Sequence, residues 1–345
     1  MALRDEILEQ PQALARLLDA APGAYAGLAA QLQERRPRFV LIAARGTSDN
    51  AALYAQYLFA IRNSLSVALA APSTVTLYGA RPDMRDALVI GISQSGRSPD
   101  ILAVLQEAGA QGALTVALVN DAASPLAAAA QEVVDLRAGP ERATAATKSY
   151  TNELLAVALL SAALDAPTGD ESADLARIPE LVAAALATED AARAVSAGHA
   201  ARTHGVVLGR GLAYATAREW SLKLQEMALV LVQPYSTADF EHGPLALAEP
   251  DFAVLAVAPS GVALDGQREV LSRLRREFGA RLLAISDEDE VLGLDEGLRL
   301  PRDIPGWLSP IVEIVPGQLY AYHLTVARGL DPDAPRTIAK VTETL

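Results

Sequence analysis

The sequence predicts an α/β protein made of two tandem doubly wound parallel-sheet domains, each a flavodoxin-like sandwich of three α/β/α layers. Short apolar runs alternate with helical patterns along the chain, and the whole alternation occurs twice. Strands that are apolar throughout are typical of parallel sheets covered by helices on both faces. The length of 345 residues also suits about two domains of roughly 150 residues each.

The duplication has an offset of 165 residues, because the Arg45-Gly46 pair after one apolar run recurs as Arg210-Gly211 after another. Each half then repeats the same order of strands and helices. The predicted strands are 38–44, 87–92, 114–119 and 132–136 in the first half and 205–209, 252–257, 281–285 and 297–300 in the second. In the first half, one predicted helix ends near Phe59, the next covers 99–108, and a closing helix begins at Thr151. In the second half, the corresponding helices end near Val232, cover 267–278 and begin at Gly317.

These elements predict a domain organisation of four parts. An N-terminal helix lies within residues 1–24, a first domain covers 25–168, and a second domain covers 190–330. We expect the C-terminal tail, 331–345, to fold over the active site. An Ala-rich helical stretch around 170–200 links the two domains.

Composition excludes several classes of protein. A net charge of −13 argues against binding to nucleic acid, and the absence of cysteine excludes disulfides, thiolate metal sites and cysteine nucleophiles. The four histidines have no metalloprotease spacing, so we expect no metal. The N-terminus carries acids instead of a signal peptide's basic run, and the longest apolar stretch, 154–164, is too short to span a bilayer. We therefore expect a cytoplasmic protein that does not bind membranes.

Lysine is rare in this chain. Of the 29 basic residues only three are lysines, Lys148, Lys223 and Lys340. Unlike arginine, lysine can lose its proton near neutral pH and can form a Schiff base. These three positions are therefore candidates for sites that need the ammonium itself, although an arginine-rich coding bias gives the same pattern.

The segment from Ser93 to Pro99 (SQSGRSP) predicts an anion site between a buried strand and a helix. Ser98 suits the N-cap and Pro99 the first helical position, so hydroxyls, backbone N–H groups and the helix dipole converge. Helix capping alone would also explain Ser98-Pro99. The matching loop of the second half, 258–261 (APSG), keeps the turn but has fewer hydroxyls, which favours ligand binding in the first half. Ser48 and Thr147 could reach the same crevice.

Together these features resemble the sugar isomerase (SIS) domain family, including the isomerase half of glucosamine-6-phosphate synthase and glucosamine-6-phosphate deaminases. The resemblance runs from about residue 45 to the C-terminus. Its motifs, in order, are ARGTSDNAA, GISQSGRSPD, ATAATKSYTNEL, GRGLAYATAREWSLKLQE, DFEHGPLAL and DAPRTIAKVTETL.

The resemblance implies a role for each matched residue. Glu226 matches the base that moves a proton between C1 and C2, His242 the ring-opening acid/base from the neighbouring subunit, and Lys340 a lysine near the sugar carbonyl. Glu219 and Lys223 match polar residues that support the site. The residues that match the sugar-phosphate clamp are Ser48, Ser93, Gln94, Ser95 and Ser98, and we add Thr147 to this binding group.

The residues alone leave simpler interpretations open. Glu219, Lys223 and Glu226 share one helix face at i, i+4 and i+7, where a Glu–Lys pair is also common on exposed surfaces. His242 precedes Gly-Pro in a loop, where histidines are usually solvated, but histidine also exchanges protons near neutral pH. Lys340 could equally be a solvated tail residue.

The sequence also departs from the synthase pattern. Arg97 stands where the synthase motif commonly has an acid, and Ala146 stands where it has a serine. The form GRSPD is closer to the deaminase and deglycase branches of the family.

The predicted function is deamination of glucosamine 6-phosphate to fructose 6-phosphate and ammonia, in a homodimer with a shared active site and without any cofactor. The chain has no cysteine that could serve a glutaminase. The alternatives are another phosphosugar isomerase, a deglycase acting on an amine-linked sugar phosphate, or a non-catalytic sugar-phosphate sensor. A sensor needs a second module, and it leaves Glu226, His242 and Lys340 unexplained.

Overall fold

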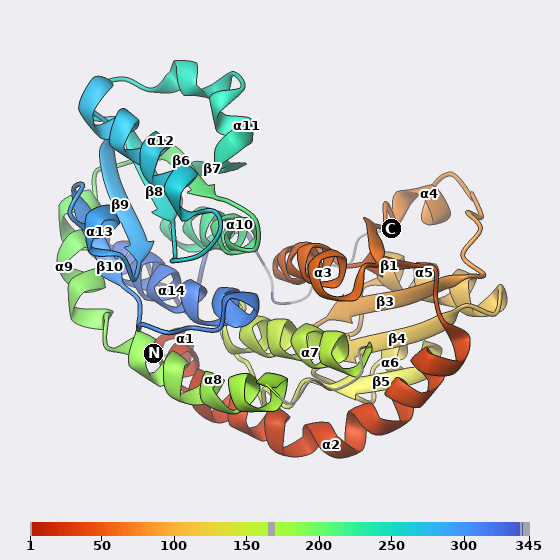
Figure 1. The fold of residues 1–345 in the computed structure, drawn as a ribbon. Coiled ribbons are helices and arrows are strands. Elements are labelled where there is room, and N and C mark those ends of the chain that lie inside the picture. The colour runs from red at the N-terminus through yellow and green to blue at the C-terminus, as the bar shows by residue number, and fades with distance from the viewer. Residues whose placement is uncertain (1, 165–169, 339, 341–345) are drawn as a thin grey trace. The chain divides into compact units, whose positions relative to one another are not determined.

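The computed structural model describes residues 2–164, 170–338 and 340 (Figure 1). The described chain divides into two compact units, each built around one sheet. We name them the N-unit, which contains residues 12–141, 148–164, 170–176 and Lys340, and the C-unit, which contains 2–11, 142–147 and 177–338.

The N-unit contains a parallel sheet of five strands in the order β2-β1-β3-β4-β5. Every residue of the central strand β3 is buried, and its neighbours β1 and β4 hold it in register through pairs such as Val89 with Leu41 and with Thr115. The strands are β1 (Phe39–Ala43), β2 (Ser66–Leu69), β3 (Ala87–Ser93), β4 (Leu114–Val119) and β5 (Glu132–Asp135).

Helices cover both faces of this sheet. Figure 1 shows α3 and α7 side by side on one face, with α5 and α6 on the other. Apolar side chains of α5, such as Ile101 and Leu105, pack with Val89 and Val119 of the strands. The helices of this part of the chain are α2 (Gln10–Arg35), α3 (Thr47–Asn63), α4 (Ser73–Thr76), α5 (Pro99–Ala110), α6 (Pro125–Ala129) and α7 (Lys148–Leu164).

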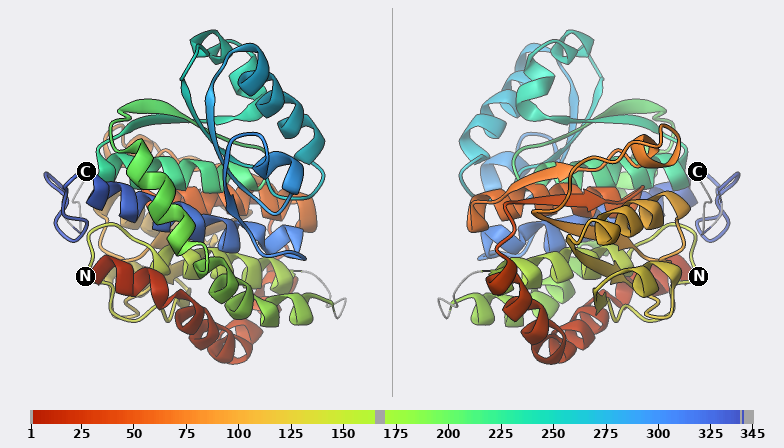
Figure 2. Two further views of the ribbon diagram at one scale, coloured as in Figure 1. Left: turned by 90° about the vertical axis from the view of Figure 1, so that its left-hand side faces the viewer. Right: turned by 90° about the vertical axis from the view of Figure 1, so that its right-hand side faces the viewer.

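The C-unit repeats this architecture with strand order β10-β9-β8-β6-β7. Its strands are β6 (His204–Gly209), β7 (Leu231–Ser236), β8 (Ala253–Val257), β9 (Arg281–Ser286) and β10 (Glu296–Arg299). Its helices are α1 (Ala2–Leu8), α9 (Glu189–His199), α10 (Ala213–Lys223), α11 (Thr237–Glu241), α12 (Leu264–Glu277), α13 (Asp289–Leu292) and α14 (Ser309–Ala327), and α8 (Asp170–Leu186) precedes α9. The left view of Figure 2 faces these strands, and the right view faces those of the N-unit.

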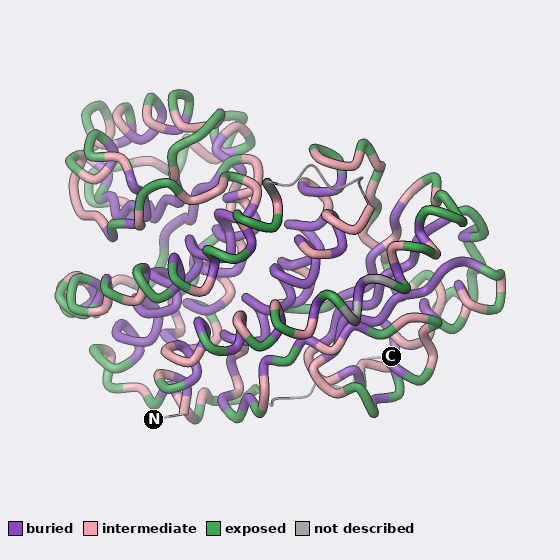
Figure 3. Tube along the Cα trace, turned by 60° about the horizontal axis from the view of Figure 1, so that its bottom comes forward, coloured by how far each residue is buried: buried purple, intermediate pink, exposed green. Residues whose placement is uncertain are grey.

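The predicted fold class is confirmed. All strand pairs in both sheets are parallel, and each sheet has the doubly wound order 2-1-3-4-5 counted along its own strands. The tube of Figure 3 shows buried residues concentrated along the strands and the inner sides of the helices. Within the part of the chain that the structure describes, no helix is long and apolar enough to cross a membrane.

The prediction of four strands in each half was wrong, because each sheet has a fifth. The missed strands, β2 and β7, both lie at the edge of their sheets. β2 is only four residues long with no buried residue, and β7 contains Pro234, which an edge strand tolerates because one side needs no backbone partner. The predicted helix ending near Val232 was wrong for the same reason, since Val232 belongs to β7.

The N-terminal helical region extends further than its predicted boundary at residue 24. α2 continues to Arg35 and includes Pro22. Asp333 at the start of the tail accepts hydrogen bonds from the backbone N–H groups of Ala2 (3.0 Å) and Leu3 (2.8 Å). Of the predicted tail over the active site, residues 339 and 341–345 lie outside the described residues.

One acidic side chain lies inside the core of the C-unit. Glu313, on α14, is fully buried and accepts a hydrogen bond from the Thr216 hydroxyl at 2.9 Å. Burial raises the pKa of Glu313 to about 7, although hydrogen bonds from Ser309 and Thr216 oppose the rise.

This carboxyl predicts a pH-dependent stability. The unfolded pKa is near 4.5, so between pH 4.5 and 7 the folded state binds more protons than the unfolded state, and stability falls as pH rises. The loss across this window should reach about 3 kcal/mol. In urea unfolding across pH 4.5–7, the free energy of unfolding of Glu313→Gln should rise relative to that of the wild type by this amount. An unchanged difference between the two proteins across the window would contradict the prediction.

Candidate functional site

The predicted phosphate loop lies at the carboxyl edge of the N-unit sheet, where β3 ends. Two hydrogen bonds hold its backbone: the Gln94 carbonyl accepts from the Asn120 N–H, and the Gly96 carbonyl accepts from the Leu126 N–H. Gly96 has φ +61°, and a Cβ there would lie 2.1 Å from the Ser124 hydroxyl oxygen. The loop conformation therefore requires glycine at this position.

The hydroxyls of the loop have different local partners. Ser93 Oγ accepts from Gly96 N–H at 3.1 Å, and Ser95 Oγ accepts from Arg97 N–H at 3.3 Å. Ser98 occupies the N-cap of α5 with Pro99 at the start of the helix, but its side chain makes no capping hydrogen bond. Capping alone therefore does not account for the Ser98 hydroxyl.

Charged groups flank this loop. Arg45, after β1, pairs with Asp100 at 2.8 Å, and Asp100 also accepts from Ile101 N–H. Arg97 pairs more loosely with Asp121 at 3.5 Å and is mostly exposed. Both guanidinium groups are thus partly neutralised by nearby carboxylates.

Ser48 lies in the first turn of α3, after β1. It is nearly buried, and its hydroxyl donates to Glu153 Oε1 of α7 at 2.8 Å. The predicted clamp residues thus lie at the carboxyl edge of one sheet: Ser48 follows β1, and Ser93 is the last residue of the neighbouring β3. The structure joins Ser48 to an acidic partner that sequence reasoning did not select.

Two further predicted residues lie around the start of α7. Lys340 donates to Glu141 Oε2 at 2.8 Å, within the N-unit. Thr147 is buried and groups with the C-unit, where its carbonyl accepts from Gln318 Nε2 at 3.4 Å. Its predicted role in binding phosphate stays a prediction.

In the C-unit, Lys223 joins the two predicted carboxylates. Its ammonium lies 2.5 Å from Glu226 Oε2 and 3.4 Å from Glu219 Oε1. Lys223 and Glu219 are buried, whereas Glu226 exposes 26% of its side chain. The structure therefore brings together all three residues predicted to share one helix face.

The helix changes form at this point. α10 ends at Lys223 and continues as a π-helix over Leu224–Ala228, which contains Glu226. Wide turns of this kind are rare and are frequent at functional sites. Glu226 is thus held on a widened turn by a buried ammonium.

Burial of the Lys223 ammonium favours its neutral form. The charges of Glu219 and Glu226 outweigh this effect, however, and raise the pKa of Lys223 above its ordinary value. Lys223 therefore stays a cation at neutral pH, and one of its two carboxylates remains accessible to solvent.

His242 follows α11 and precedes Gly243, which has φ +141°. Its side chain is exposed and makes no hydrogen bond to any residue that the structure describes, while its backbone N–H donates to Asp239 O. Glu241, immediately before it, lines a pocket of about 290 Å³ with Arg210, Thr237 and Gln267 at the carboxyl ends of β6 and β7.

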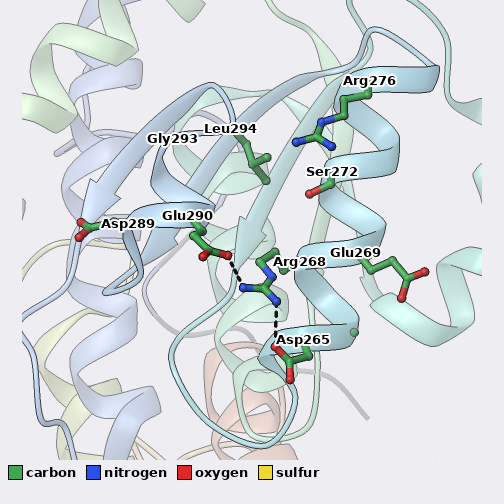
Figure 4. Close-up of a pocket in the computed structure, with 10 residues that line it drawn as sticks. Asp265, Arg268, Glu269, Ser272, Arg276, Asp289, Glu290, Gly293 and Leu294 are labelled. Atoms are coloured by element: carbon green, nitrogen blue, oxygen red, sulfur yellow. Dashed lines mark hydrogen bonds and ion pairs between the residues drawn. The ribbon is translucent and has the colours of Figure 1, made fainter.

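A larger groove of about 740 Å³ lies elsewhere on the C-unit, along α12 and α13 (Figure 4). Arg268 crosses it and pairs with Asp265 at 3.1 Å and with Glu290. None of the predicted site residues lines this groove, and its acids and arginines largely neutralise one another. Volume alone therefore does not locate the chemistry.

Sequence reasoning missed two acidic residues that contact predicted ones. Glu153 accepts from Ser48, while Glu141 accepts from Lys340 and from Ser149. Glu141 had no local signal, because its partner Lys340 is remote in sequence. Glu153 had none, since it begins an apolar helical stretch.

A family model described as the SIS domain matches the chain twice, over residues 35–163 and 200–327. Among curated proteins, the isomerizing glutamine–fructose-6-phosphate aminotransferase of Methanothermobacter thermautotrophicus is 38% identical over 310 residues, 87% of this chain and 51% of that protein. The protein of the same name from Thermococcus kodakarensis is 34% identical over 97% of this chain and 56% of its own length. The chain thus spans about half the length of these curated relatives.

Solved structures give a matching result. A Silicibacter pomeroyi protein, provisionally named a phosphosugar isomerase, is 36% identical with a TM-score of 0.89, covering 96% of this chain and 100% of that one. The C-terminal domain of glucosamine-fructose-6-phosphate aminotransferase from Francisella tularensis is 26% identical with a TM-score of 0.88, covering 96% and 98%. The glucosamine-6-phosphate deaminase of Thermotoga maritima, at 21% identity and a TM-score of 0.78 over the full length of both chains, shares the fold.

The buried triad predicts a stability effect. Lys223→Met removes the ammonium between two carboxylates, one of them buried, and should lower the free energy of unfolding by about 3–5 kcal/mol in urea titrations. Adding Glu219→Gln removes the buried charge, so the double variant should recover part of this loss. A double variant no more stable than Lys223→Met alone would contradict the electrostatic explanation.

Proposed function

The chain belongs to the SIS domain family, and from this premise we propose that it is a phosphosugar isomerase that deaminates glucosamine 6-phosphate. The observation that carries the proposal is Glu226, a partly exposed carboxylate on a π turn whose Oε2 is held by the buried Lys223 ammonium. A fixed carboxylate with one accessible side suits a base that takes a proton from carbon and returns it to a neighbouring carbon.

The proposed reaction needs three proton movements. His242 opens the sugar ring by transferring a proton to the ring oxygen, which produces the C1 aldehyde. Glu226 then removes the C2 proton, made acidic by the adjacent carbonyl, and delivers it to C1. A third proton passes from the C2 amine to O1, so the product carries a C1 hydroxyl and an imine at C2. The imine then adds water and releases ammonia and fructose 6-phosphate. The residues proposed here supply acid, base and charge for these steps.

Phosphate binding is assigned to the N-unit alone, and the C-unit gives the physical reason. In the C-unit the corresponding loop residue, Ser260, donates its backbone N–H (2.7 Å) and hydroxyl (2.6 Å) to the Asp287 carboxylate. Asp287 directly follows β9, whereas the residue directly after β4 is Asn120, whose amide bonds to Gly139 and Ala138 instead. In the C-unit loop, the Ser260 donors are thus already bonded to a carboxylate of the same unit. The negative charge of that carboxylate would repel a phosphate.

The curated relatives carry a name that describes amination of fructose 6-phosphate, and both directions use the same isomerisation. The second candidate function is therefore the isomerase step of hexosamine synthesis, favoured by 38% identity to such a relative. Lys340 is proposed to contact the sugar carbonyl in either direction. We propose a homodimer, with the histidine of one copy serving the site of the other.

The central experiment is an assay for ammonia. The purified chain with glucosamine 6-phosphate should release ammonia and fructose 6-phosphate in equal amounts, without added metal and in the presence of EDTA. A parallel assay with fructose 6-phosphate and ammonium chloride tests the synthetic direction. Glu226→Gln should abolish both, since the base acts in each direction. Release of no ammonia from any hexosamine phosphate would refute the deaminase proposal.

One-sided phosphate binding predicts unequal effects of matched serine variants. Ser95→Ala removes a hydroxyl from the N-unit loop and should raise KM by about 10- to 150-fold, the equivalent of roughly 1.5–3 kcal/mol for a hydrogen bond to a charged group. Ser260→Ala, at the same position of the repeat, should leave KM unchanged. Equal rises in KM for the two variants would overturn the assignment.

A further inference from the structure

Glu141 is an acidic residue in the loop between β5 and α7 to which the proposed chemistry assigns no role. Its side chain has no exposed surface, yet it carries a carboxylate. A buried carboxylate is tolerated only where charged or hydrogen-bonding partners replace its lost water.

The start of α7 supplies the first partners. Ser149, the second residue of the helix, donates its backbone N–H to Glu141 Oε1 at 3.0 Å and its hydroxyl to Oε2 at 2.7 Å. The amide ends of a helix carry partial positive charge, which favours a carboxylate there. Ser149 thus holds both oxygens of the Glu141 carboxylate.

Lys340 is another partner of Glu141. Its ammonium donates to Glu141 Oε2 at 2.8 Å and keeps 25% of the side chain exposed. An ammonium has three N–H donors, so a bond to Glu141 leaves two that can reach another group. The carboxylate therefore holds the ammonium in place without occupying all of its N–H donors.

We propose that Glu141 is a positioning residue that holds the Lys340 ammonium ready for the sugar carbonyl. This inference rests on the proposed function, in which Lys340 touches the substrate. It also explains why lysine stands here in a chain that otherwise prefers arginine. A planar, larger guanidinium would fill the space beside Glu141 with its own paired donors and leave no compact charge for a ligand.

The pair differs from an ordinary surface ion pair in one respect. Exposed pairs hold long side chains only loosely, because water competes for both charges. Here the carboxylate is wholly buried and already bound by Ser149, so only the lysine can move. Loss of the Glu141 charge should therefore release Lys340 and leave the rest of the unit in place.

The first measurement does not require enzyme activity. Amine acylation by acetic anhydride, located by peptide mass spectrometry, reports the exposure of Lys340; Lys148 and Lys223 are buried and serve as internal references. In Glu141→Gln, Lys340 should be acylated about tenfold faster or more. Loss of a charge-assisted hydrogen bond shifts the equilibrium between bound and released ammonium by roughly 10- to 150-fold. Glu141→Asp, which keeps the charge, should fall between the two. An unchanged rate in Glu141→Gln overturns the proposal, whether or not the protein is a deaminase.

The second measurement is kinetic. Glu141→Gln should lower kcat by about 10- to 100-fold, the scale of a misplaced catalytic group, while KM changes little. Combined with Lys340→Met it should cost no more than Lys340→Met alone, because Glu141 acts only through that ammonium. Additive losses, or a normal kcat with a released lysine, would overturn the positioning role.

A matched control tests for general damage to the unit. Glu171→Gln breaks the ion pair with Arg62 (3.0 Å) in the same unit and should alter neither kcat nor acylation of Lys340. Melting temperatures of all variants check folding. If Glu141→Gln fails to fold, Ser149→Ala replaces it: loss of one donor to Glu141 should give a smaller change in the same direction in both measurements, and no change in either overturns the proposal.

Discussion

The parallel direction of every strand is the constraint on which the rest of the molecule depends. Because all strands of a sheet point the same way, the loops that follow them must meet at one edge. Ser48 and Ser93 are distant in the chain, yet Ser48 follows β1 and Ser93 ends β3, and these strands are neighbours in the sheet. The helices after these strands also begin at this edge, so their N–H groups and partial positive charges gather where an anion could bind.

The two copies of the duplicated fold differ in structure at the carboxyl edges of their sheets. In the N-unit, the helix after the first strand, α3, is regular to Asn63, and the next loop presents hydroxyls. In the C-unit, the corresponding helix α10 opens into a π turn that holds Glu226, and the corresponding loop is closed by Asp287. The residue after the strand differs accordingly: Asp287 bonds the loop residue Ser260, whereas the neutral Asn120 bonds Gly139 and Ala138. The two halves share a fold because the apolar core is repeated, and they differ because the edge residues are not.

The sequence predicted the fold class and the six central strands because central parallel strands are apolar throughout, and it also predicted the edge strands β5 and β10. It missed β2 and β7, which are edge strands with one neighbour each. β2 has no buried residue, and β7 contains a proline, so neither shows the pattern of a central strand. Of the candidate site, the resemblance implied Glu219, Lys223 and Glu226, and their spacing predicted a shared helix face. Neither foresaw the π turn that contains Glu226. Sequence reasoning missed Glu141 and Glu153 because their partners, Lys340 and Ser48, are remote in sequence, and no local pattern marks such a pair.

The three lysines show how the composition of the chain relates to burial in the structure. Arginine satisfies most basic positions on this acidic surface, where a guanidinium can pair with carboxylates in water. Lys223 is wholly buried between two carboxylates, and Lys148 is wholly buried at the first position of α7. Lys340 lies against a carboxylate that has no exposed surface. A planar five-donor head is difficult to satisfy in such confined sites, whereas a compact ammonium needs three partners at most. The confined space of a buried site therefore explains lysine at positions 148 and 223. At position 340 the side chain is partly exposed, and lysine is explained there by the buried carboxylate that its ammonium contacts.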